Sequence, residues 1–349
     1  MNCTGFLVNK VKFVVNRDSF LNHHNHIYLS RKDKQLVQAY KVNLKYKVKD
    51  IVKTLGEFFE REILINTNRL DFEYFAGMSM LDNRIIKVAT DKIVSCGNFV
   101  DSSGMASHTL SNKLIETAFL EFIERQSFIL NYLSKSKGVK LRISNNKKIS
   151  KYDEYIKNFV DSVDYYNISI DEDINVILSI AIGRYKKAVG LGTHTCIENA
   201  IIKSQKEVLQ NFAVDCSKYD YEDIGFYYGE NNEKDIYHKN FSSLSPEDVK
   251  SLYLYLSDSP SYIVKDINKN TELDIDDFIK KISDKYGMDP LIVAINSERD
   301  VNCLKIAKVV DLHWFPHMKP DHYSNDMYNY VEQQTGLSLD RNICIIPFP

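Results

Sequence analysis

The chain has 349 residues, of which 44% are hydrophobic and 26% are charged. This composition is ordinary for a globular protein, and the length suffices for one large domain or two smaller ones. The formal net charge of −2 at pH 7 supplies no general positive field, so we expect no nucleic-acid partner and expect any anionic ligand to be held by local groups.

The cysteines indicate the cellular compartment. Six are scattered along the chain without a C-x-x-C pair or zinc-finger spacing, and they are interpreted as reduced thiols. The first residues lack the features of a signal peptide, and no apolar run is long enough to span a bilayer. We therefore predict a cytoplasmic protein that has no membrane partner.

Residues 1–45 are predicted to form a strand and loop region that packs on a main domain of residues 46–349. Val11–Val15 has the composition of a short strand. The histidines that follow, His23, His24 and His26, stand in a polar cluster. Because no second histidine cluster lies nearby in the sequence, we predict a loop there rather than a metal site.

A first helix is predicted from about residue 47 to residue 64. Its predicted buried stripe consists of apolar residues at helical spacing, namely Ile51, Val52, Leu55, Phe58, Phe59 and Ile63. The opposite side of the helix carries Thr54, Glu57, Glu60 and Arg61. Positions i, i+3 and i+4 share one helix face, so Glu57, Glu60 and Arg61 project together.

A small-residue segment, residues 101–109, follows the strand-like runs 85–89 and 93–96 and leads into a second helix. Small residues let backbone N–H groups approach a ligand, and a helix N-terminus favours phosphate. The alternative is an ordinary turn in which Thr109 or Ser111 caps the helix.

The second helix, residues 111–133, nearly repeats the first motif with Glu121, Glu124 and Arg125. One copy alone is readily explained as an exposed face with an i, i+4 ion pair. Two such helices facing each other would gather carboxylates that repel at neutral pH unless cations neutralise them. Mg²⁺ is the expected cation, since it binds carboxylates together with phosphate oxygens, and this indicates a nucleotide.

A third unit repeats the order of elements. Two strands within residues 168–182 precede Gly190–His194, predicted as a loop, and a helix over residues 198–213 that presents Ser204, Glu207 and Gln210 at threefold spacing. Residues 134–151 are predicted to be an exposed connection. We predict an α/β (α+β) fold in which one supersecondary unit recurs and mixed sheets surround the nucleotide.

These motifs resemble, in order and spacing, the ATP-binding motifs of the YcaO family. The match comprises Thr54-x-x-Glu57-x-x-Glu60-Arg61, then Glu121-x-x-Glu124-Arg125, then Ser204-x-x-Glu207-x-x-Gln210. Residues 103–108 and the ending Pro347-Phe348-Pro349 are similar to azoline-forming, microcin-type members. The chain departs from the family where Thr54 replaces the usual serine and Ile345 replaces a first proline.

The resemblance implies an ATP-dependent cyclodehydratase with ATP and Mg²⁺ as cofactors. Such enzymes phosphorylate a backbone amide oxygen of a ribosomal precursor peptide after a Cys, Ser or Thr side chain attacks the carbonyl carbon, which yields thiazolines or oxazolines. By resemblance, Glu57, Glu60, Glu121, Glu124 and Glu207 hold metal, with Thr54, Ser204 and Gln210 completing the nucleotide site. Arg61 and Arg125 either contact phosphates or orient the glutamates.

The end of the chain and the partners are further expectations. Two prolines would stiffen the tail, and the carboxylate of Pro349 is a candidate general base beside the nucleotide. Because no long N-terminal extension is visible, we expect a separate protein to present the precursor's leader, and an FMN-dependent dehydrogenase to oxidise the azolines. A homo-oligomer is a family-level expectation.

Two other activities compete with cyclodehydration. The same ATP chemistry with another nucleophile would give a thioamide or an amidine, which the Pro-Phe-Pro ending disfavours. A catalytically silent YcaO-like scaffold that docks a peptide would have no need for a carboxylate cluster that is unfavourable without metal.

Overall fold

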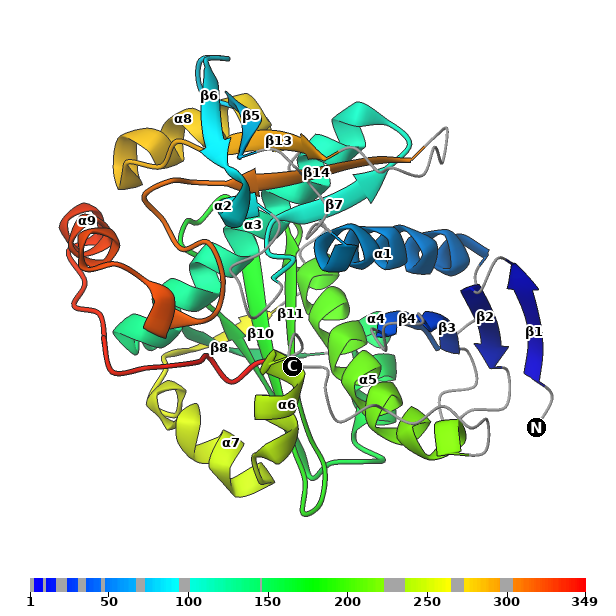
Figure 1. The fold of residues 1–349 in the computed structure, drawn as a ribbon. Coiled ribbons are helices and arrows are strands. Elements are labelled where there is room, and N and C mark those ends of the chain that lie inside the picture. The colour runs from blue at the N-terminus through cyan, green and yellow to red at the C-terminus, as the bar shows by residue number, and fades with distance from the viewer. Residues whose placement is uncertain are drawn as a thin grey trace.

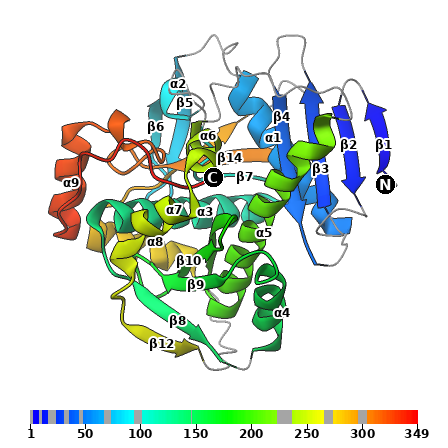
Figure 2. The ribbon, with the colours of Figure 1, turned by 90° about the horizontal axis from the view of Figure 1, so that it is seen from below.

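The computed structural model describes most of the chain. The described residues are 3–8, 11–16, 24–30, 36–44, 48–66, 73–93, 101–144, 146–222, 236–264, 273–295 and 304–349. In Figures 1 and 2, an N-terminal sheet and the helix α9 lie at opposite ends of the molecule.

The N-terminal sheet is an antiparallel meander in the order β1-β2-β3-β4. Its strands are β1 (Cys3–Val8), β2 (Val11–Asn16), β3 (His24–Ser30) and β4 (Leu36–Val42). The strand predicted at Val11–Val15 is confirmed, whereas the loop predicted for the histidines is wrong, since His24 and His26 lie in β3. The predicted division of the chain at residue 45 stays a prediction.

A second sheet has five antiparallel strands in the order β6-β5-β13-β14-β7. They are β5 (Tyr74–Ser79), β6 (Ile85–Ala89), β7 (Met105–His108), β13 (Leu291–Ile295) and β14 (Lys305–Val310). The small-residue segment before the second helix is therefore partly a strand, which corrects the loop predicted there. Within this strand, β7, Ala106 pairs with Ala307 of β14.

The third sheet has the order β11-β10-β9-β8-β12 and is mixed, as the sequence predicts. Only β12 runs parallel to its neighbour, β8, while the other pairs are antiparallel. The strands are β8 (Val139–Ile143), β9 (Ser162–Asn167), β10 (Asn175–Ile182), β11 (Lys187–His194) and β12 (Ser261–Val264). The loop predicted at Gly190–His194 is wrong, because those residues continue β11.

The three long helices each follow a strand, so the strand-then-helix order recurs. They are α1 (Val48–Asn66), α3 (Ser111–Ser134) and α5 (Ile197–Glu222). The shorter described helices are α2 (Thr90–Ile93), α4 (Lys147–Ile156), α6 (Ile236–Ser243), α7 (Pro246–Leu252), α8 (Ile275–Tyr286) and α9 (Asn325–Thr335). The exposed connection predicted for residues 134–151 is wrong, since β8 and the start of α4 lie within it.

Helix α3 is the centre of the molecule, since it contacts β7 and β14 of the second sheet and β10 and β11 of the third (Figures 1 and 2). A helix covered on both sides must be apolar nearly all round. Accordingly every residue from Gln126 to Leu133 is buried. Leu110 occupies the N-cap position of α3, and its side chain makes no capping hydrogen bond. The N-cap residue is therefore neither Thr109 nor Ser111.

Helices α1 and α5 connect the N-terminal sheet with the other two sheets. Helix α1 contacts β3, β4 and β7, and α5 contacts β4, β10 and β11. The buried stripe predicted for α1 holds for Phe58, which is 1% exposed, but not for Val52, which is 60% exposed. In the described residues, no helix has the length and apolar character needed to cross a membrane.

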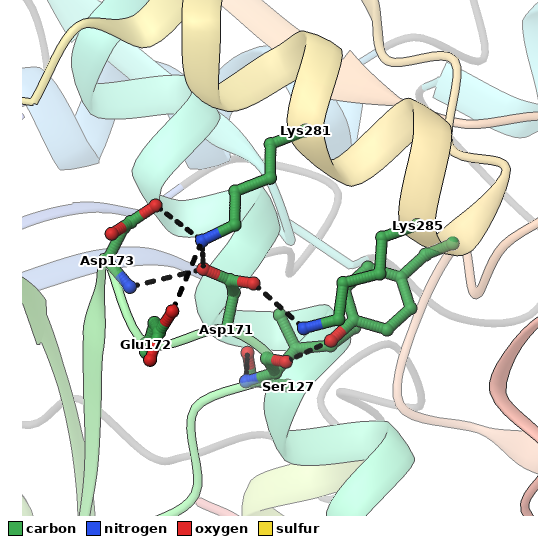
Figure 3. Close-up of polar contacts among 8 residues, drawn as sticks. Ser127, Asp171, Glu172, Asp173, Lys281 and Lys285 are labelled. Carbon is green, nitrogen blue, oxygen red and sulfur yellow. Dashed lines mark hydrogen bonds and ion pairs between the residues drawn. The ribbon is translucent and has the colours of Figure 1, made fainter.

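A polar clip joins the β9–β10 connection to α8. Figure 3 shows the Asp171 carboxylate between two lysines of α8, with Nζ of Lys281 at 2.6 Å and Nζ of Lys285 at 3.1 Å. The Asp171 side chain has 0% exposure. On the same connection, the Ser127 hydroxyl of α3 accepts the N–H of Ile170 at 3.2 Å. This clip ties α8 and α3 to the third sheet.

Candidate functional site

The three long helices bring the predicted carboxylates into one electrostatically coupled group. Glu60 of α1 interacts with Glu57 and Glu121, and Glu121 of α3 interacts with Glu124 and with Glu207 of α5. Glu207 and Glu124 also interact with each other. The residues predict facing helices for α1 and α3, the family resemblance adds Glu207 of α5, and the structure brings the glutamates of all three helices into one group.

Glu57 is held by two cations. Its Oε1 lies 2.8 Å from Arg61 Nη2, one turn along α1, and its Oε2 lies 2.8 Å from Nζ of Lys41 on β4. Burial alone would raise the pKa of Glu57, but Lys41 and Arg61 outweigh it and hold that pKa below its usual value. Lys41 was missed in the sequence, because nothing in a strand separated from α1 indicates which side chain reaches the helix.

In the part of the chain that the structure describes, Glu60 forms no ion pair within 4.0 Å. Burial raises its pKa to about 7, although a hydrogen bond from the Ser107 hydroxyl of β7 opposes the shift. Ser107 is close to α1 because Gly56 has no side chain, and an added Cβ at Gly56 would collide with the Ser107 hydroxyl. The small residues of the predicted loop thus act as a close-packed strand beside the carboxylates.

Glu121 and Glu207 are partly buried and interact with one another electrostatically. Burial raises the pKa of Glu121 well above its usual value and the pKa of Glu207 to about 7, and nearby Arg125 only partly opposes both shifts. Glu207 also accepts the backbone N–H of Leu191 from β11 at 2.6 Å. The positively charged side chains nearby therefore do not fully offset the charge that these carboxylates would carry when ionised.

Glu124 is anchored from the third sheet. The Thr193 hydroxyl donates to Glu124 Oε2 at 2.7 Å, and the Thr193 carbonyl accepts from Lys203 Nζ at 2.7 Å. Both residues were missed as site members. The only signals in the sequence were that Thr193 follows a glycine-containing segment and that Lys203 adjoins the Ser204 motif.

Arg125 differs from Arg61 in its surroundings. Its Nε is buried without a hydrogen-bond partner among the described residues. Nη1 lies 3.9 Å from the Met318 sulfur, and the guanidinium carbon lies 4.9 Å from the centre of the Phe348 ring. Burial lowers the pKa of Arg125, but Glu124, Glu207 and Glu121 outweigh it and raise that pKa. A permanently charged group whose Nε donor has no partner among the described residues is thus present beside the carboxylates.

The last residues of the chain pack into the middle of the molecule in both views (Figures 1 and 2). Ile346, Pro347 and Phe348 are buried, and Pro349 is partly exposed. The Pro347 carbonyl accepts the Tyr253 hydroxyl at 2.8 Å, and the Phe348 ring centre lies 5.2 Å from that of Phe128 on α3. The segment before Pro349 therefore lies next to Arg125.

The polar residues predicted beside the glutamates have other contacts. Thr54 is fully buried, and its hydroxyl donates to the Asp50 carbonyl at 2.7 Å. Ser204 is fully buried, shares a 2.6 Å hydrogen bond with Ser179 of β10 and donates to the Ile201 carbonyl at 2.8 Å. Gln210 is partly buried on α5. Ligand contacts of these three residues stay predictions.

The donor set fits Mg²⁺ with a phosphate ligand better than a metal held by protein alone. Within the described part of the chain, no three His, Cys, Asp or Glu side chains form a ready-made metal site. Mg²⁺ typically takes one or two protein carboxylates, with substrate phosphates and water supplying the other oxygens. The group of neighbouring carboxyls, together with an Arg125 Nε that has no hydrogen-bond partner among the described residues, suits a cation and an anion together.

Solved structures share the fold. An E. coli microcin synthetase McbBCD complex with pro-MccB17 bound matches with a TM-score of 0.72 and 18% identity, over 97% of this chain and 96% of that chain. A YcaO from Methanopyrus kandleri bound with AMPPCP and Mg²⁺ matches with a TM-score of 0.61 and 11% identity, over 89% and 84%. A heterocyclase in complex with substrate and cofactor matches with a TM-score of 0.68 and 13% identity, over 98% and 55%.

Among curated protein sequences, none matches at a significant level. A family model described as YcaO cyclodehydratase, ATP- and Mg²⁺-binding, matches residues 68–310, more than half of the chain. This range includes the motifs of α3 and α5, whereas the α1 motif and Pro349 lie outside it. The family's ligands, ATP and Mg²⁺, are the cofactors that the sequence predicts. The chain therefore belongs to the YcaO family of ATP- and Mg²⁺-dependent enzymes.

Proposed function

We propose that the chain is the cyclodehydratase subunit of a peptide-modifying system. It would use ATP to phosphorylate backbone amides of a ribosomal precursor peptide and so form thiazolines or oxazolines from Cys, Ser or Thr. The observation that carries the proposal is the group of glutamates on α1, α3 and α5 beside the unpartnered Arg125 Nε. Phosphoryl transfer depends mainly on positioning and charge neutralisation, and these residues are suited to both.

In this proposal the glutamates and the two arginines have different roles. Mg²⁺, when bound, would neutralise the charge on the phosphates. Arg61 orients Glu57, because the two already form an ion pair at 2.8 Å. Arg125 binds phosphate, because its guanidinium has no ion pair within 4.0 Å among the described residues and its Nε has no hydrogen-bond partner there. The proposed metal and nucleotide residues are Glu57, Glu60, Glu121, Glu124 and Glu207, with Thr54, Ser204 and Gln210 as further nucleotide contacts.

Pro349 is proposed as the general base through its carboxylate. The packing of Ile346, Pro347 and Phe348 supports a defined position for it near Arg125. Adding two glycines after Pro349 would displace the carboxylate while keeping the Phe348 side chain. We expect the extended protein to bind Mg-ATP normally but to form no rings, and full ring formation would rule out this role.

The proposed partners are a precursor peptide and a separate protein that recognises its leader. The similar microcin synthetase structure is a multiprotein complex with a pro-peptide bound, which supports both proposals. An FMN-dependent dehydrogenase acting on the azolines, and a homo-oligomer, remain expectations. Size-exclusion chromatography with light scattering, on the chain alone and with each candidate partner, tests these assemblies; elution as an unassociated monomer in every mixture would contradict them.

The decisive experiment measures phosphate release from Mg-ATP by the purified chain, with its leader-binding partner and a Cys/Ser-rich precursor, followed by the mass of the peptide. We expect phosphate release coupled to the loss of one water per modified residue. Glu124→Gln should reduce both signals by about 100-fold or more. Arg125→Lys should raise the KM for ATP about tenfold or more through the loss of charge-assisted hydrogen bonds, whereas Arg61→Lys should change it less.

Other outcomes distinguish the alternatives. Phosphate release with a sulfur-for-oxygen mass change would indicate a thioamide, and incorporation of an amine with loss of water would indicate an amidine. A complete mixture that neither binds nor hydrolyses ATP would leave the silent scaffold as the better account.

A further inference from the structure

We propose that Tyr253 is a positioning residue for Arg125. It lies between α7 and the short 3₁₀ helix Leu254–Leu256. In this proposal Tyr253 fixes the segment Pro347–Phe348 so that the Phe348 ring supports the Arg125 guanidinium in the orientation that receives phosphate. The inference rests on the proposed function, in which Arg125 contacts the nucleotide.

The first link is a buried hydrogen bond between distant parts of the chain. Tyr253 is 4% exposed, and its hydroxyl donates to the Pro347 carbonyl at 2.8 Å across 94 residues of sequence. Burial raises the pKa of Tyr253 well above its usual value, so the hydroxyl stays protonated and remains a donor. The carbonyl it holds belongs to the peptide bond that leads directly into Phe348.

The second link is the contact between Phe348 and Arg125. Phe348 is 2% exposed, and its ring is packed between Phe128 and the guanidinium, whose carbon lies 4.9 Å from the ring centre. A guanidinium within about 6 Å of an aromatic face is attracted electrostatically to the ring. No ion pair of Arg125 within 4.0 Å occurs among the described residues, so this ring is one of the few contacts that set its orientation.

Met318 provides a second support for the same arrangement. Its sulfur contacts Arg125 Nη1 at 3.9 Å, and its carbonyl accepts the N–H of Ile346 at 3.2 Å. Its own N–H donates to the partly buried Asp101 carboxylate at 3.3 Å. The segment is thus held at Ile346 by Met318 and at Pro347 by Tyr253, and Phe348 follows with little freedom.

The tyrosines around Tyr253 offer a matched control. Tyr255 is partly buried, and its hydroxyl donates at 2.8 Å to the Asn131 side chain of α3 rather than to the C-terminal segment. Tyr253→Phe and Tyr255→Phe therefore each remove one hydrogen-bonded hydroxyl from the same tyrosine cluster. Only the first releases Pro347.

The experiment compares these two variants in the full chain by two measurements. In the first, arginine Nε–Hε NMR reports the ring-current shift of Arg125, whose resonance is assigned by its disappearance in Arg125→Lys. Phe348→Leu defines the shift that follows when the ring is lost. We expect Tyr253→Phe to move the resonance in the same direction and Tyr255→Phe to leave it in place.

The second measurement is calorimetric binding of Mg-AMPPCP. We expect Tyr253→Phe to raise the dissociation constant about tenfold relative to Tyr255→Phe, because a misplaced guanidinium loses a charge-assisted hydrogen bond. An unchanged Arg125 resonance in Tyr253→Phe, or equal effects of the two variants on the resonance, would overturn the inference. If the wild-type chain binds no Mg-AMPPCP, the proposed function fails, while the NMR comparison still decides whether Tyr253 positions Arg125.

Discussion

Glu60, Glu121 and Glu207 are partly buried side chains whose carboxyl groups lie near others of the same charge. Among the described residues, Lys41, Arg61, Arg125 and Lys203 interact electrostatically with this group, and the first two already form ion pairs with Glu57. Burial therefore leaves the pKa values of Glu60 and Glu207 at about 7 and that of Glu121 well above its usual value. A bound divalent cation would lower these pKa values by favouring the ionised carboxylates.

The raised pKa values of these carboxyl groups predict a pH dependence of nucleotide binding. A carboxyl group with a raised pKa is partly protonated near pH 7, and Mg²⁺ binds only the carboxylate, so binding must release protons. For one group with a pKa of about 7, the affinity for Mg-AMPPCP should fall about tenfold between pH 8 and pH 6. Calorimetry in buffers of different ionisation enthalpy measures both the affinity and the protons released.

Glu60→Gln supplies the control, because glutamine has no proton to release at that position. Its remaining pH dependence should be smaller than that of the wild type. A wild-type affinity that stays constant from pH 6 to pH 8 without proton release would show that these carboxyls do not bind the metal.

At the scale of elements, glycines decide how closely the helices approach the strands. On β11, an added Cβ at Gly192 would collide with the Ala200 carbonyl and lie 2.5 Å from the Ser204 backbone nitrogen. On α1, an added Cβ at Gly56 would collide with the Ser107 hydroxyl, which is a side-chain atom. At Gly192 the added Cβ would meet backbone atoms, which cannot easily move. At Gly56 it would meet a hydroxyl group, which can rotate away. Replacing the two glycines should therefore have different effects.

We predict that Gly192→Ala destabilises the fold and that Gly56→Ala mainly affects binding. Overpacking against backbone typically lowers the free energy of unfolding by about 1–3 kcal/mol, whereas alanine within a helix gains roughly 0.5–1 kcal/mol over glycine and offsets a rotated serine. Urea unfolding should therefore separate the variants. Gly56→Ala should still weaken Mg-AMPPCP binding, because the rotated Ser107 hydroxyl no longer contacts Glu60. Equal stability losses in both variants would contradict this account.

At the scale of the whole molecule, the Asp171 clip joins parts that are distant in the sequence. Lys281 and Lys285 of α8 meet a carboxylate 110 and 114 residues earlier in the chain. Burial alone would raise the pKa of Asp171, but hydrogen bonds from Lys281, the Asp173 backbone N–H and Lys285 outweigh it and hold that pKa below its usual value. The clip therefore stabilises the fold while Asp171 is ionised.

We predict that Asp171→Asn lowers the free energy of unfolding by about 2 kcal/mol at neutral pH, since it removes hydrogen bonds to a charged group. A depressed pKa contributes stability that is present above the unfolded-state pKa of about 4 and is lost as the pH falls through the folded-state value. The difference between wild type and variant should therefore disappear in acid. Urea unfolding from pH 7 to pH 3 measures this, and Asp173→Asn, at a side chain 49% exposed, is the control with a smaller effect at neutral pH. A constant difference down to pH 3 would contradict the linkage.

The sequence by itself determined the helices and their chemistry. Helical spacing put Glu57 with Glu60 and Glu121 with Glu124 on single faces, and the polar face of α5 followed from the same periodicity. These signals are local, because residues three and four apart in a helix are neighbours wherever the helix packs. The mixed α/β class and the family also followed from the order of such segments.

Only the tertiary structure decided what surrounds these groups. Lys41, Thr193 and Ser107 reach the glutamates from strands whose positions depend on long-range pairing. The small residues of 105–108 and 190–194 predict loops because they weaken strand propensity, but pairing with β14 and β10 overrides that local preference. Arg61 and Arg125 occupy equivalent motif positions, yet one forms an ion pair and the other faces Met318 and Phe348. The reason is that a motif specifies which side chains share a helix face, whereas packing between helices, strands and the last residues specifies what that face meets.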